Sequence, residues 1–256
     1  MFRIFRIAWL NLWRNRRRTA VTIAAVSLNT FILVTTYALM EGLLRQTEEN
    51  ATQLYTGEAQ LHVPGYLTDH SLHEALDNSL AILKDADASN LAAVQRAYGY
   101  GLVSQGTKSA GAMFWGVDPQ PERAAFRLAD HLWQGGFLAD TPTKALVLGK
   151  KLARVLNAGI GSEVVVVAQA ADGSLGNDLF TVVGILRSVG EAVDRSAAIM
   201  HLNDFRDLFV MPGGVHEIAV NSRNRMPLPA LATHLRTLAP ELEVKTWREL
   251  MPTLSD

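Results

Sequence analysis

The stretch from Thr19 to Met40, TAVTIAAVSLNTFILVTTYALM, contains no charged residue and follows directly on three consecutive arginines. Fifteen of its 22 residues are apolar. Since an α-helix rises about 1.5 Å per residue, this stretch would form a helix about 33 Å long, enough to cross a bilayer core of about 30 Å. Its threonines, Ser27 and Asn29 can bond backbone carbonyls or a neighbouring helix. The stretch predicts a transmembrane helix over residues 19–41.

The charges on the two sides of this helix predict its orientation. Six arginines and no acidic residue lie in the first eighteen positions, whereas Glu41, Glu48 and Glu49 lie just beyond the apolar stretch. By the positive-inside rule, the N-terminus is expected in the cytoplasm and the residues after about 41 across the membrane. Two alternatives are a cleaved signal peptide, which usually has a shorter apolar stretch ending in small residues, and the buried helix of a soluble protein.

Residues 1–18 predict an interfacial elbow helix on the inner leaflet. Phe2, Phe5, Trp9 and Trp13 recur at helical spacing, and most arginines gather on the other side. A basic leader without structure is the alternative. The residues expected to anchor the chain at the membrane interface are Trp9, Trp13, Arg14, Arg16, Arg17 and Arg18.

Composition limits what the rest of the chain can do. Beyond position 18 there are 18 basic and 25 acidic residues, which argues against a nucleic-acid partner. No cysteine is present, so the chain has neither disulfides nor a thiolate metal site. About 200 residues follow the membrane helix, enough for a substantial hydrophobic core.

The residues after the membrane helix predict an α+β domain. The helical pattern continues as a stalk over 42–56 and stops at Gly57. Residues 58–63 alternate as a half-buried strand does. Asn90 or the serine before it can cap a short helix through Tyr98, and two strands, about 99–106 and 109–117, follow.

A central section, residues 119–212, is predicted to be rich in strands. It begins with a helical stretch over 121–132, and Asn203 is expected to cap a helix over 204–209. A second helix is expected over 150–156. The expected strands of this section are 145–148, 163–169, 179–186 and 197–201.

Beyond the linker Pro212-Gly213-Gly214, the pattern predicts a strand over 217–221, a helix over 228–238, a strand over 242–245 and the start of a further helix at Trp247. These elements and those before position 118 can form a split βαβ sheet that the central section interrupts.

Motifs for catalysis are absent from the sequence. Gly149-Lys150-Lys151 lacks the remaining residues of a phosphate-binding loop. His70 and His73 could share a metal with Asp69 or Asp77, but a third strong ligand is missing. We therefore assign no catalytic, cofactor-binding or metal-binding residue and expect the chain not to be an enzyme.

Several motifs, in order, resemble the mechanotransmission class of ABC transporter permeases, which includes lipoprotein-releasing permeases, the macrolide exporter and the cell-division permease. The opening Ala8-Trp-Leu-Asn-Leu-Trp-Arg-Asn-Arg-Arg-Arg-Thr19 resembles the family's basic approach to its first membrane helix. The further stretches that resemble signatures of the lipoprotein-releasing branch are Gly57–Tyr66, Gly116–Pro119, Leu148–Ala153, Phe180–Ile185 and Gly190–Leu202.

The resemblance implies a permease of the bacterial inner membrane that moves lipoprotein, lipid or another amphiphile by ATP-driven mechanotransmission. It implies a periplasmic domain with a porter-like subdomain (57–118 and 213–246), an inserted β-rich, sabre-like subdomain (119–212) and the start of a return stalk (247–256). The implied partners are cytoplasmic ATPase subunits that bind ATP, a second permease copy or paralogue, the lipid bilayer and a periplasmic carrier or adaptor protein.

Such permeases have three further membrane helices after the periplasmic domain. The resemblance therefore implies either a fragment or a protein whose partner supplies the rest. The alternative is a singly anchored periplasmic binding or scaffold protein without transport activity. Candidate contacts to substrate or partner helices are Phe31, Val34, Tyr37, Leu39, Met40, Leu43 and Leu44.

Overall fold

The computed structural model describes residues 14–77, 79–223 and 226–252, and the chain divides into two compact units, Met1–Asn50 and Ala51–Asp256. Trp9 and Trp13, two of the expected interface anchors, lie outside the described residues.

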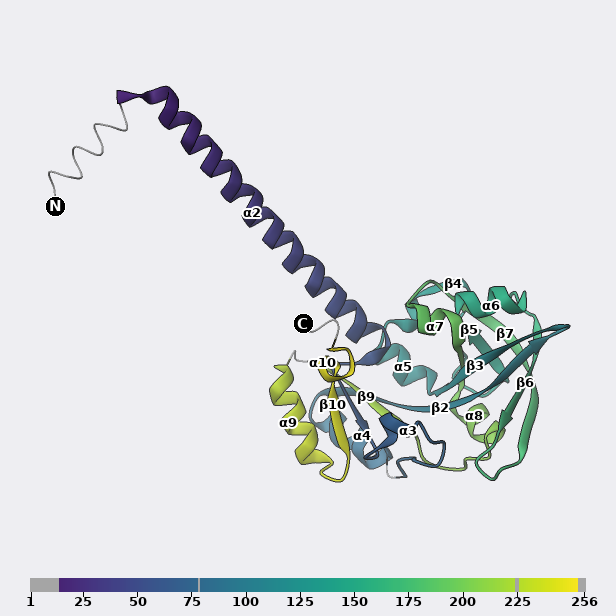
Figure 1. Cartoon of the computed structure of the whole chain (residues 1–256). Coiled ribbons are helices and arrows are strands. Elements are labelled where there is room, and N and C mark those ends of the chain that lie inside the picture. Colours follow the sequence, from purple (N-terminus) through teal and green to yellow (C-terminus); the bar gives the residue numbers. More distant parts are fainter. Residues whose placement is uncertain (1–13, 78, 224–225, 253–256) are drawn as a thin grey trace. The chain divides into compact units, whose positions relative to one another are not determined.

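The first unit contains one long helix, α2 (Arg16–Ala51), drawn as a single uninterrupted coil in Figure 1. Its 36 residues include no proline and one glycine, Gly42, which explains why the helix is not broken. Within the described residues, one segment is long and apolar enough to cross a membrane, Arg16–Leu43, and a window of 18 residues within it has a mean hydropathy of 1.7. Arg16, Arg17 and Arg18, expected in a separate interfacial helix, instead begin α2.

The second unit is a mixed α/β domain. The described residues form one ten-stranded sheet with the order β10-β1-β9-β2-β3-β8-β5-β7-β4, and β6 pairs with β2 and β7. The strands are β1 (Ala59–His62), β2 (Leu91–Gln105), β3 (Lys108–Val117), β4 (Leu132–Gly135), β5 (Ala145–Leu148), β6 (Glu163–Gln169), β7 (Leu175–Leu186), β8 (Ala197–His201), β9 (Glu217–Ser222) and β10 (Glu243–Thr246). The helices and turns are η1 (Thr52–Thr56), α3 (Tyr66–Asp69), α4 (Ser79–Ala88), α5 (Pro119–Ala125), η2 (Leu128–Asp130), α6 (Lys150–Leu156), α7 (Glu191–Ser196), α8 (Leu202–Leu208), α9 (Leu228–Leu238) and α10 (Trp247–Leu250).

One end of the sheet has the arrangement of a split βαβ unit. Strand β9 lies between β1 and β2 and is antiparallel to both, so β1 and β2 run parallel to each other. Helix α4 lies between them in sequence. Leu61 of β1, Ile82 of α4 and Leu235 of α9 join one hydrophobic core, which shows that the two helices cover the same face of these strands.

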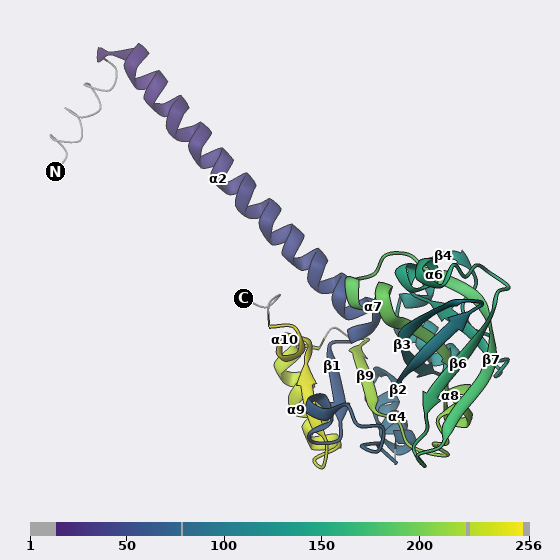
Figure 2. The same ribbon diagram turned by 45° about the vertical axis from the view of Figure 1, so that its right-hand side comes forward.

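The other end of the sheet closes on itself. The ring consists of six strands and is formed by the pairings β2–β3, β3–β8, β8–β5, β5–β7, β7–β6 and β6–β2. Figure 2 labels β3, β6 and β7 of this ring on the side away from β10. Buried residues from these strands, including Phe114, Val166 and Phe180, belong to the same core. Strands β2 and β3 thus belong both to the ring and to the end with the split βαβ unit.

Four expectations from the sequence were wrong. The expected helix from about Asn90 to Tyr98 is the first half of β2, because Leu91–Arg96 pairs along β9. All four residues of β1 are buried rather than half-buried, because both faces of the strand are covered. Ala59 and Leu61 join the hydrophobic core, while Gln60 bonds η1 and His62 stacks on Tyr66. The expected helix over 121–132 is replaced by α5, η2 and β4. His201, not Asn203, caps α8, since its side chain accepts the Asn203 N–H.

Candidate functional site

Alternation along the strands brings polar and aromatic side chains to the sheet face opposite α4 and α9. Successive side chains of a strand point to opposite faces, so Arg96, Tyr98 and Tyr100 of β2 share one face. Arg96 lies directly opposite Glu217 of β9, and Tyr98 lies directly opposite Trp115 of β3.

Arg96 is the centre of a buried charge cluster. Its side chain is 1% exposed and makes a two-pronged ion pair with Glu122 of α5, with Nη2–Oε1 and Nε–Oε2 distances of 2.6 and 3.2 Å. Nη1 donates to Glu217 Oε1 at 3.0 Å. The guanidinium also lies 4.5 Å from the ring centre of Phe126, within the range of a cation–π contact. Carboxylates from two elements therefore hold one buried cation.

The same arginine fixes the first turn after α2, because Nη1 also donates to the carbonyl of Tyr55 in η1. Three other carbonyls of this turn are bonded too. Arg127 N–H donates to Gln53 O at 2.9 Å, and Gln60 Nε2 donates to Thr56 O at 2.7 Å. The carbonyl of Thr52 accepts the Gly57 N–H at 2.9 Å. The turn is thus held to the domain through its backbone.

Next to the charge cluster, two histidines enclose a tyrosine. Tyr66 of α3 stacks between His62 and His216, with ring centres 5.4 and 5.3 Å apart and planes inclined by 14° and 11°. His62 Nδ1 lies 3.0 Å from His216 O, and its Nε2 lies 3.0 Å from Gln60 Oε1. The stack attaches α3 to the ends of β1 and β9.

These groups line a pocket of about 180 Å³. The lining combines phenol, indole and imidazole rings with one carboxylate. The lining residues are Tyr55, Gln60, His62, Tyr66, Leu67, His70, Tyr98, Tyr100, Met113, Trp115 and Glu217.

Hydrogen bonds and burial set the protonation states around the pocket. His216 Nδ1 accepts the Tyr98 N–H at 2.8 Å, so the neutral ring carries its proton on Nε2, which lies 3.1 Å from Leu72 O. Burial lowers the pKa of His216. Burial, and then the charge of Glu217, raises the pKa of Tyr98 well above its ordinary value. Tyr98 therefore stays a phenol and donates to Glu217 Oε1 at 3.0 Å.

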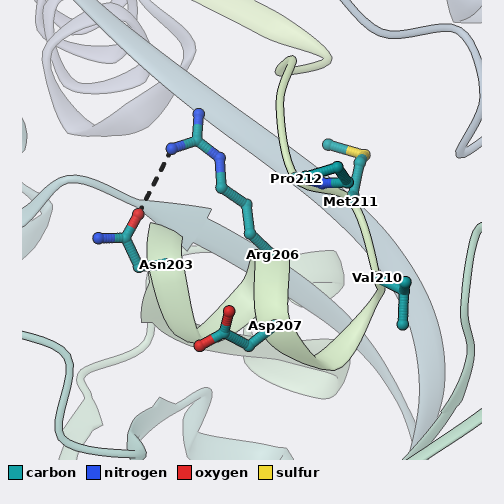
Figure 3. A pocket seen from close by; sticks show the side chains of 6 residues that line it. All are labelled: Asn203, Arg206, Asp207, Val210, Met211 and Pro212. Atoms are coloured by element: carbon teal, nitrogen blue, oxygen red, sulfur yellow. Dashed lines mark hydrogen bonds between the residues drawn. The ribbon is translucent and has the colours of Figure 1, made fainter.

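A second pocket, of about 470 Å³, lies at the C-terminal end of α8 and is drawn in Figure 3. Arg206 extends toward Asn203, with an Nη1–Oδ1 distance of 3.4 Å. Val210 has a φ of 48°, and the Met211 N–H donates to Arg206 O at 2.9 Å. This is a Schellman-type helix end with valine where glycine is usual. The helix cap thus explains the unusual backbone of Val210.

The residues predicted to contact substrate or partner helices lie on α2. Phe31, Val34, Tyr37, Leu39, Met40 and Leu43 are all at least half exposed. Leu44 belongs to α2, but its side chain is outside the described part. Among the side chains that the structure describes, none of the six exposed ones takes part in the charge cluster or lines the aromatic pocket.

Sequence reasoning missed the charge cluster and the pocket. Because a helix was predicted through Tyr98, the alternation that places Arg96, Tyr98 and Tyr100 on one face of a strand was not recognised. The signal was present, because small residues, Ala97 and Gly99, occupy the positions between these large side chains. Alternating large and small residues are typical of a strand with two different faces.

Comparison with known proteins shows the family to which the chain belongs. Residues 19–238 match the model of the MacB-like periplasmic core domain, so the chain belongs to this family. A curated relative is the lipoprotein-releasing system transmembrane protein LolC of Neisseria meningitidis, 25% identical over 233 residues. The alignment covers 88% of this chain and 53% of that protein, so the chain spans about half the length of the relative.

Two solved structures share the fold. The periplasmic region of MacB from Actinobacillus actinomycetemcomitans superposes with a TM-score of 0.55 at 14% identity, covering 77% of this chain and 92% of that one. The extracellular domain of the ABC-type transporter YknZ from Gram-positive bacteria gives 0.52 at 13% identity, covering 73% and 98%. The expected family is thereby confirmed.

Proposed function

We propose that the chain forms the first membrane helix and the periplasmic domain of an ABC transporter permease in the bacterial inner membrane. The permease moves a lipoprotein, a lipid or another amphiphile out of that membrane. A separate cytoplasmic subunit hydrolyses ATP, and a second permease copy completes the transport path. Membership of the MacB-like family and the likeness to LolC support this proposal.

The proposed transmission of motion is supported by the hydrogen bonds that hold η1 to the rest of the domain. The chain leaves α2 at Ala51, and Arg127, Arg96 and Gln60 bond three carbonyls of the next five residues. These are the carbonyls of Gln53, Tyr55 and Thr56. A continuous helix that ends in a fixed turn passes a displacement on, whereas a flexible loop would absorb it. We infer that η1 couples motion of the membrane helix to the periplasmic domain.

The proposal divides the domain into a porter-like part, 57–118 with 213–246, and an inserted β-rich part, 119–212. The split βαβ arrangement supports the first and the ring of strands supports the second. Because β2 and β3 enter both, the two parts move together through these strands. Residues 247–256 would start the return stalk toward the membrane.

A matched pair of insertions tests the coupling in cells that depend on the gene encoding this chain. Three glycines between Asn50 and Ala51 should abolish complementation, while the complex still copurifies with its ATP-binding subunit. The same insertion beside Asp172, in the exposed β6–β7 loop, should be tolerated. Full activity with glycines at the junction would contradict mechanical coupling, and purification without any ATP-binding subunit would contradict the transporter assignment.

A further inference from the structure

The aromatic pocket beside the charge cluster has the chemistry of a cation site. Its walls contain four tyrosines and one tryptophan, Tyr55, Tyr66, Tyr98, Tyr100 and Trp115, together with Glu217. Aromatic rings attract cations through their quadrupole, and groups of several rings are the usual recognition site for quaternary ammonium.

The buried charges next to the pocket do not balance. Arg96 contributes one positive charge, whereas Glu122 and Glu217 contribute two negative charges. The three side chains are 1%, 1% and 6% exposed, so solvent screens them little. Both the Arg96 and the Tyr98 bonds to Glu217 use Oε1, and Oε2 takes part in neither. Among these three side chains the carboxylates are in excess by one charge, which a cationic ligand would offset.

The remaining polar groups narrow the class of ligand. The Tyr98 hydroxyl donates to Glu217 Oε1 at 3.0 Å, which places a phenol group next to the carboxylate. The indole N–H of Trp115 is buried and has no hydrogen-bond partner within the described ranges. A ligand that carries an oxygen close to its cationic nitrogen would supply the acceptor that this N–H lacks.

The size of the pocket limits the ligand to a small group. Pockets for drug-sized molecules begin at about 300 Å³, whereas this one measures about 180 Å³. Tyr100 lies at the accessible side, with 56% of its surface exposed, while Trp115 is 3% exposed. A small head group can enter, and a longer attached chain would have to stay outside.

We propose that this pocket binds an organic ammonium group with a nearby hydroxyl or ester oxygen, such as the head group of an amino alcohol. Glu217 neutralises its charge, Tyr55, Tyr98 and Tyr100 offer aromatic surface to it, and Trp115 donates to its oxygen. This site does not depend on the transport function, because it is complete within residues 51–256.

Titration of the full chain in an uncharged maltoside detergent with choline, followed by calorimetry and ligand-detected NMR, tests the proposal. The control ligand is 3,3-dimethylbutan-1-ol, which has the shape and hydroxyl of choline but no charge. We expect saturable binding of choline and at least tenfold weaker binding of the neutral alcohol. Equal binding of the two, or no binding of choline, would overturn the proposal.

Variants locate the binding in the pocket. Tyr100→Leu should weaken choline binding about fivefold, since it removes one exposed ring. Leu102→Ala is the matched control, because Leu102 is 51% exposed on the same strand but does not line the pocket. Glu217→Gln should abolish the preference for choline over the neutral alcohol. Unchanged choline affinity in Tyr100→Leu would contradict the assigned site, whatever the result for transport.

Discussion

At the scale of single residues, Arg96 has the largest expected influence on stability. It joins η1, β2, α5 and β9 through Tyr55, Glu122 and Glu217, and it is almost fully buried. Removing one partner of a buried ion pair leaves a charge without compensation, which is costlier than losing a surface pair.

Arg96→Met should therefore lower the free energy of unfolding by about 3–5 kcal/mol, because two buried carboxylates lose their partner. Urea unfolding of the full chain in detergent, followed by circular dichroism of the strands, measures the change. Arg123→Met is the matched control, since Arg123 lies next to Glu122 but pairs with Asp140 at the surface. That change should cost less than about 1 kcal/mol. Equal effects of the two substitutions would contradict the role of the cluster.

His216 predicts a loss of stability in acid. Burial lowers its pKa in the folded state below the ordinary value of 6.5, so the unfolded chain takes up a proton first. This contribution is fully present above pH 6.5 and is lost as the pH falls below 6.5 toward the folded-state pKa.

The difference in unfolding free energy between pH 7.5 and 5.5 should therefore be smaller in His216→Gln than in the unaltered chain. His73→Gln, at an exposed position, should leave that difference unchanged. A pH dependence that survives in His216→Gln would assign the effect to another group.

At the scale of elements, strand β3 packs against α8 through a glycine. A Cβ added to Gly116 would lie 2.6 Å from Cβ of Phe205, whereas one added to Gly111 would meet nothing within 4 Å. Both glycines lie on β3, so the comparison separates packing from backbone effects.

Gly116→Ala should destabilise the domain by about 1–3 kcal/mol through overpacking. Gly111→Ala should be neutral or slightly stabilising, because alanine restricts the unfolded chain. Thermal unfolding of the two variants side by side measures this, and similar melting temperatures would mean that α8 is not held tightly on β3.

The elements also show what could be predicted from the sequence. β6 and α9 have the predicted bounds, because their patterns are long and regular. The prediction of a helix over Leu91–Tyr98 was wrong. The local sequence is rich in alanine, which favours a helix. The segment forms a strand instead because it pairs with β9, which lies more than 120 residues further along the chain. The site depends on that same pairing, which no local pattern contains.

At the scale of the whole molecule, the proposed transport role requires that α2 crosses the membrane. Arg14, Arg16, Arg17 and Arg18 precede or begin its apolar segment, and Glu41 lies near the other end. By the positive-inside rule, we expect the arginines in the cytoplasm and residues 51–256 in the periplasm. A transport role for the domain requires this orientation.

Cysteine labelling tests this orientation directly, because the chain contains no cysteine of its own. Arg14→Cys and Asp172→Cys each introduce one exposed thiol, and spheroplasts are treated with a membrane-impermeant maleimide. We expect Asp172→Cys to react in intact spheroplasts and Arg14→Cys to react only after the membrane is permeabilised. Labelling of Arg14→Cys in intact spheroplasts, or protection of Asp172→Cys, would contradict the account.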